Sequence, residues 1–76
     1  MSTAVIQFIS NMIYKANKNA MLFLQEGKSS SSEKLLLRAE AVLAKYQNDK
    51  LAFLINLTCN NLACCYKKYY LQIFFY

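Results

Sequence analysis

The chain contains one glycine and no proline in 76 residues, so very little in it interrupts a helix. Its apolar residues recur in steps of three and four, which is the spacing of one face of an α-helix. Gly27 is a natural stop for the first such helix, and Lys28 is favourable near the helix's negative end. The residues that predict this first buried stripe are Ile9, Ile13, Ala16, Ala20 and Phe23.

A run of four serines follows the glycine and is too short for a flexible linker. Ser30 and Glu33 have the S-x-x-E spacing of a capping box, in which each side chain bonds a backbone N–H at the helix start. We therefore expect a short turn and a second helix, antiparallel to the first. The predicted second stripe is Leu35, Leu36, Ala39, Val42, Leu43 and Tyr46.

Residues 47–50 form the next break, and Asn48 with Asp49 suits a turn or a new N-cap. A third stripe follows at helical spacing. The sequence thus predicts an all-α fold, an antiparallel helical hairpin plus a third helix, with a simple three-helix bundle as the alternative. We expect residues 1–68 to form one domain. The third stripe is Leu51, Leu54, Ile55, Thr58, Leu62, Cys65 and Tyr66.

Residues 69–76 are an apolar, aromatic tail in which seven of the eight residues are apolar or aromatic. We expect the third helix to continue through this tail and its apolar end to meet another surface. As an uncovered strand the tail would be an aggregation hazard. A further interpretation is that the chain is a fragment of a larger repeat protein. The residues expected to support self-association are Tyr69, Leu71, Phe74 and Phe75.

The charged residues exclude several function classes. Nine Lys/Arg and four Asp/Glu give a net charge of +5, but the bases are scattered and only Lys67 and Lys68 are adjacent. Nucleic-acid binding is not expected, because such proteins gather their bases on one face. The chain has no histidine, so the usual general base and the Ser-His and Cys-His pairs are missing. We expect neither an enzyme nor a cofactor.

The three cysteines, Cys59, Cys64 and Cys65, contain no C-x-x-C motif and cannot make a four-ligand zinc site without histidine. Their odd number favours reduced thiols and a cytoplasmic protein. No segment approaches 18 consecutive apolar residues, so no transmembrane span is expected. The apolar run 4–9 is short and has no basic residue before it, so it does not read as a signal peptide.

Two stretches are similar to each other, because in each a small residue is followed three positions later by an aromatic. These pairs are Ala20 with Phe23 and Ala63 with Tyr66. The pattern resembles the tetratricopeptide repeat, a unit of two antiparallel helices with small residues at the packing positions. With Gly27 at the turn glycine, the resemblance covers about residues 13–66 as one and a half degenerate repeats. The other matched positions are Ser32, Leu36, Ala39 and Leu62.

The sequence also departs from this family. The opening large aromatic is replaced by Ala16 in one unit and Cys59 in the other, and the closing turn proline is absent. Ala20 and Ala63 lie 43 positions apart, whereas the family's repeat is about 34 residues. The helices or their join must therefore be longer than in the family.

The resemblance implies a non-catalytic protein–protein interaction module of scaffold type, with a groove for a protein or peptide partner. Asparagine and lysine in such a groove can hydrogen-bond an extended peptide's backbone or carboxylate. A second hypothesis is a small membrane-associated helical protein, acylated at Cys64 and Cys65 beside two lysines. The groove positions that the resemblance implies are Asn17, Met21, Leu24, Gln25, Asn60, Cys64, Lys67 and Lys68.

Overall fold

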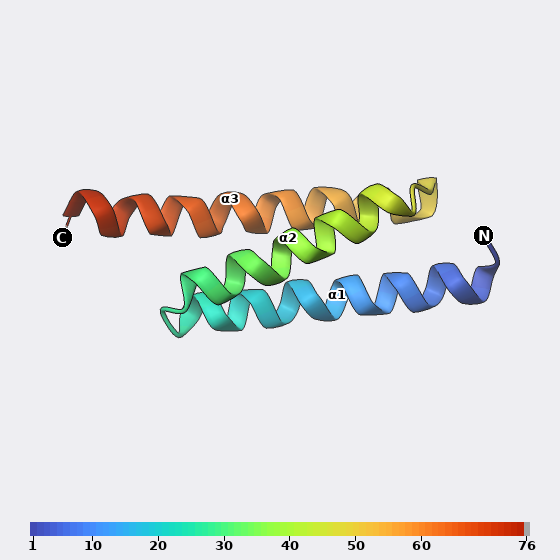
Figure 1. Cartoon of the computed structure of the whole chain (residues 1–76), viewed down its shortest axis with the longest axis horizontal. Coiled ribbons are helices and arrows are strands. Elements are labelled where there is room, and N and C mark those ends of the chain that lie inside the picture. Colours follow the sequence, from blue (N-terminus) through green and yellow to red (C-terminus); the bar gives the residue numbers. More distant parts are fainter. Residues whose placement is uncertain (76) are drawn as a thin grey trace.

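The computed structural model consists of three long helices, and it describes the backbone of residues 1–75 and the side chains of residues 1–68. The elements are α1 (Thr3–Gln25), α2 (Ser29–Lys45), the short 3₁₀ helix η1 (Asp49–Leu51) and α3 (Ala52–Phe75). α1 and α3 run in the same direction, and α2 runs antiparallel to both (Figure 1). No strand occurs in residues 1–75, so the predicted all-α fold, a helical hairpin followed by a third helix, is confirmed.

Helix α1 begins earlier than its apolar stripe. The Ser2 hydroxyl accepts a hydrogen bond from the Val5 backbone N–H at 3.2 Å, which satisfies one of the free donors at the helix start. The helix therefore begins at Thr3, and its first turn precedes the first buried residue, Ile9.

The glycine turn ends α1 as predicted. Gly27 has a φ of +79°, the left-handed conformation that favours glycine. The Lys28 N–H donates to the Phe23 carbonyl at 2.8 Å, and the Gly27 N–H donates to the Leu24 carbonyl at 3.1 Å. These two bonds are those of a Schellman motif, which satisfies the last carbonyls of the helix.

Helix α2 begins at Ser29, so the predicted capping box of Ser30 and Glu33 is wrong. Lys28 occupies the N-cap position, and no side chain bonds the helix start. The Lys28 carbonyl accepts the first helical bond, from the Ser32 N–H at 3.0 Å, while its own N–H closes α1. Lys28 thus takes part in both the end of α1 and the start of α2, and the cap position falls on it rather than on a serine.

The break before α3 has the predicted cap. The Asn48 side chain accepts a hydrogen bond from the Lys50 N–H at 2.9 Å, and the Asn48 carbonyl accepts one from the Leu51 N–H at 2.9 Å. The chain therefore turns through η1 directly into α3. Leu51, at the end of η1, is 1 % exposed and belongs to the core.

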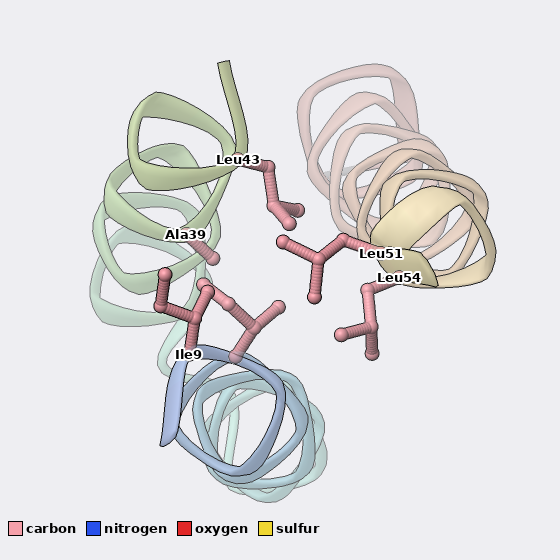
Figure 2. Packing of buried hydrophobic residues seen from close by; sticks show 6 residues of the cluster. Ile9, Ala39, Leu43, Leu51 and Leu54 are labelled. Carbon is pink, nitrogen blue, oxygen red and sulfur yellow. The ribbon is translucent and has the colours of Figure 1, made fainter. Parts of the chain in front are cut away.

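The core consists of two apolar clusters that follow one another along the bundle. The first joins all three helices and η1, and Figure 2 shows its side chains converging between the helices. The second lies nearer the α1–α2 turn. The first cluster contains Ile9, Ile13, Ala39, Leu43, Leu51 and Leu54; the second contains Ala20, Leu24, Leu36, Leu62 and Cys65.

The predicted stripes are too wide in three places. Tyr46, Ile55 and Tyr66 were expected in the buried stripes but are 38 %, 41 % and 39 % exposed. The bundle measures 48 × 17 × 15 Å, so each helix has only two neighbours and the flanks of its apolar face remain uncovered.

Within the part of the chain that the structure describes, no helix has the length and apolar character needed to cross a bilayer.

Candidate functional site

A buried polar layer separates the two core clusters. Asn17 on α1 is 2 % exposed and Thr58 on α3 is 1 % exposed. The Asn17 Nδ2 donates to the Thr58 Oγ1 at 2.9 Å and to the Ile13 carbonyl at 3.0 Å. The Thr58 hydroxyl donates to the Leu54 carbonyl at 2.7 Å, and the Asn61 Nδ2 donates to the Asn17 Oδ1 at 2.9 Å. Both buried side chains are therefore hydrogen-bonded, as groups removed from water must be.

Asn17 and Asn61 of this layer line a shallow groove between α1 and α3, with a volume of about 250 Å³. Of the predicted groove residues, Asn17 and Met21 line it. The Asn17 amide is used within the chain, so it holds the two helices together rather than offering free donors. The groove lining is Tyr14, Asn17, Lys18, Met21, Leu57 and Asn61.

The other predicted groove residues lie outside that lining. Leu24 is buried in the second core cluster. The Lys68 Nζ donates to the Leu24 carbonyl at 2.8 Å, so this lysine ties α3 to the last turn of α1. Gln25 is exposed near the turn of the hairpin. The remaining three residues are exposed on α3: Asn60, Cys64 and Lys67.

A second pocket, of about 300 Å³, lies between the C-terminal half of α2 and the start of α3. Its floor contains the buried Leu43 and Thr58, and its rim carries the carboxylates of Glu40 and Asp49. Ile55 and Cys59 line the α3 side. A sequence signal that could have indicated this edge is the seven-residue spacing of Glu33 and Glu40, which places them on the same side of α2.

The C-terminal part of α3 extends past the hairpin. The Lys68 contact to Leu24 lies next to the end of α1, and α3 continues from there to Phe75. Figure 1 shows the red end of α3 beyond the turn that joins α1 to α2. The side chains of Tyr69, Leu71, Phe74 and Phe75, predicted to support self-association, lie outside the described residues.

The cysteines and carboxylates of the described residues are dispersed. Among residues 1–68, no group of three or more Cys, Asp or Glu side chains gathers where a metal ion would bind. Cys59 and Cys64 are exposed free thiols, and Cys65 is buried. Burial raises the pKa of the Cys65 thiol above its ordinary value, with the nearby Ser32 hydroxyl opposing this effect and the Glu33 carboxylate adding to it. A buried thiol of raised pKa is a poor nucleophile.

No protein-family model, curated protein or solved structure matches this chain. The positions that resemble the tetratricopeptide repeat are partly the buried ones, since Ala20, Ser32, Leu36 and Ala39 are all at most 3 % exposed. Small and large residues alternate at helix contacts in any tightly packed hairpin, so the family resemblance stays a prediction.

Proposed function

We propose that this chain is a non-catalytic protein–protein interaction module. The observation that carries the proposal is the extension of α3 beyond the α1–α2 hairpin (Figure 1). At 1.5 Å per residue, residues 69–75 add roughly 10 Å of helix past the Lys68 contact with α1. Seven of the eight residues from Tyr69 to Tyr76 are apolar or aromatic. An apolar segment in this position favours association with another surface.

The scaffold is suited to hold such a segment rigidly. Lys68 bonds the end of α1, and Cys65 and Leu62, one and two turns earlier, are buried in the second core cluster. The extension therefore leaves the bundle from a fixed point. A helix held in one direction loses less freedom on binding than a flexible tail, which improves affinity for a given contact area.

The finer proposal is a scaffold of tetratricopeptide-repeat type in the cytoplasm, in which the end of α3 stacks on a further helical unit. The hairpin of α1 and α2 with a following parallel helix supports this arrangement. Three free cysteines support a reducing compartment. In this proposal the partner is a protein or peptide, and neither nucleic acid nor a cofactor is required.

A membrane-associated protein is the second candidate. Cys64 and Lys67 are both exposed and lie three residues apart on α3, so they share one side of the helix just before the apolar tail. An acyl chain on Cys64 together with the basic side chain would favour a bilayer surface. Binding of the unmodified full chain to anionic vesicles, at a level that depends on Lys67 and Lys68, would support this alternative.

The experiment that tests the first proposal keeps the chain length and changes the tail. The double variant Leu71→Lys and Phe74→Lys adds two charges to the extension and changes no residue of the described core. Sedimentation velocity should show association of the full chain that weakens in the variant, with unchanged helical circular dichroism. Equal sedimentation coefficients for the unaltered chain and the double variant, both measured without vesicles, would contradict association through the tail.

A further inference from the structure

The acidic residues of this basic protein are gathered along one seam. Three of the four Asp/Glu residues of the chain lie on the edge of α2 and η1 that faces α3: Glu33, Glu40 and Asp49. The fourth, Glu26, pairs with Lys28 at 3.1 Å in the hairpin turn. Within residues 1–68 no ion pair involves the three seam carboxylates. The seam therefore carries negative charge on a chain whose net charge is +5.

The opposite side of the seam is apolar and uncovered. Ile55, Cys59 and Tyr66 lie on the edge of α3 that faces α2, at helical spacing. Ile55 is 41 % exposed, Tyr66 is 39 % exposed, and Cys59 is an exposed thiol that lines the 300 Å³ pocket. We use the name α2–α3 seam for these three residues together with Glu33, Glu40 and Asp49.

The two sides of the seam influence each other. Partial desolvation raises the pKa of Tyr66, and the nearby carboxylates of Glu33 and Glu40 raise it further because they disfavour a second negative charge. The carboxylates of Glu33 and Glu40 thus lie close to Tyr66, at one end of the apolar strip. A ligand lying on the strip would be exposed to the same field.

We propose that the α2–α3 seam binds a basic amphipathic helix of a partner protein. Glu33 and Glu40 are seven residues apart, about 10.5 Å along the helix axis, which is the distance between lysines or arginines seven residues apart on a partner helix. The partner's apolar residues, at spacings of three and four, would lie over Ile55, Cys59 and Tyr66. Opposite charges fix the register and orientation of such a contact.

This inference rests on the proposed function and names the chemistry of the partner. It uses a different surface from the end of α3. The full chain carrying Leu71→Lys and Phe74→Lys therefore retains the complete seam, so failure of tail-mediated association and failure of the seam are separable.

The chain contains its own probe for the seam. Cys59 lines the pocket, Cys64 is also exposed but lies three residues from Lys67, and Cys65 is buried. The full chain is equilibrated with equal amounts of cystamine, whose half-disulfide is cationic, and dithiodipropionic acid, whose half-disulfide is anionic. Tandem mass spectrometry then gives the ratio of the two mixed disulfides at each cysteine.

We expect the cationic adduct to be favoured at Cys59 relative to Cys64 by about threefold to tenfold, because two carboxylates lie around the pocket. The preference for the cationic adduct at Cys59 should fall in high salt. It should also fall in the double variant Glu40→Gln and Asp49→Asn, which changes two exposed side chains. Equal adduct ratios at Cys59 and Cys64 in the unaltered chain would overturn the proposal without requiring any variant to fold.

A synthetic helix tests the partner chemistry directly. The probe carries leucines at spacings of three and four and lysines seven residues apart; its control carries glutamates in place of the lysines. Amide shift changes should cluster at Glu33, Glu40, Asp49 and Cys59 for the basic peptide only. The proposal would be overturned by shift changes centred on Lys18 and Met21, or by no changes with either peptide. Shift changes that depend on the concentration of the protein rather than of the peptide would also overturn it.

Discussion

The Asn17 Nδ2 donates a hydrogen bond to the Thr58 Oγ1 at 2.9 Å across the centre of the bundle, and both side chains are at most 2 % exposed. The two residues lie 41 positions apart, on α1 and α3. A register shift of either helix would place an unpaired amide or hydroxyl against apolar side chains, at a cost of about 1–3 kcal/mol for each group. The pair therefore specifies how α3 docks on the hairpin.

The first prediction concerns this pair. Thr58→Val leaves one Asn17 N–H unpaired and should lower the free energy of unfolding by about 1–3 kcal/mol. In the double variant Asn17→Leu and Thr58→Val, apolar groups replace both partners. The double variant should lose less free energy of unfolding than Asn17→Leu and Thr58→Val lose in sum, by about 1 kcal/mol or more. Urea unfolding followed by circular dichroism measures this difference, and additive losses would show that the bond does not couple the helices.

The second prediction compares two neighbours on α3. Leu54 is 0 % exposed in the first core cluster, whereas Phe53 is 59 % exposed. Leu54→Ala should cost about 2–5 kcal/mol, because it removes buried methyl groups and leaves a cavity. That loss is a large share of the stability of a domain this small. Phe53→Ala is the matched control and should change stability by less than about 0.5 kcal/mol. Similar losses of stability for both variants would contradict the orientation of α3, in which Leu54 is buried and Phe53 is exposed.

The third prediction concerns the turn between α1 and α2. Gly27 has a φ of +79°, and a Cβ built on it has open space around it. Gly27→Ala should therefore cost about 1–2 kcal/mol from backbone strain alone. Gly27→Asn should cost less, since asparagine adopts this conformation more readily. If thermal unfolding places both variants at the midpoint of the unaltered chain, the left-handed turn is absent in solution.

The fourth prediction is a loss of stability at high pH. Burial raises the pKa of Cys65 above its ordinary value of 9.0, so the folded state holds its proton more tightly than the unfolded state. This contribution is fully present below about pH 9 and is lost as pH rises through the folded-state pKa. The free energy of unfolding should thus fall more steeply above pH 9 in the unaltered chain than in Cys65→Ala. Parallel pH profiles of the two proteins would contradict a buried thiol.

The sequence was sufficient to predict the helices and most of the core. The three- and four-residue spacing identified Ile9, Ile13, Leu36 and Leu54 as buried, because periodicity reports which face of a helix avoids water. The glycine turn was predictable for a similar reason, since few other residues adopt a positive φ.

Interhelical pairing could not be predicted in the same way. Asn17 was predicted as a groove residue and does line the groove between α1 and α3, but its amide is hydrogen-bonded in the interior. A polar residue inside an apolar stripe is ambiguous until its partner on another helix is known, and Thr58 lies 41 residues away. The acidic seam was not predicted for the same reason. Its carboxylates belong to one surface only because η1 brings Asp49 to the pocket that Glu40 also lines.

The measurement that tests the central claim most directly is sedimentation velocity combined with far-UV circular dichroism, on the full chain and on a chain ending at Lys68. Every residue of the two core clusters found among residues 1–68 lies between Ile9 and Cys65, so the shortened chain keeps both described clusters. We predict that it is strongly helical and monomeric, while the full chain associates through the end of α3. If neither chain is helical and soluble alone, the interaction-module account is contradicted in favour of a fragment or a membrane-dependent peptide.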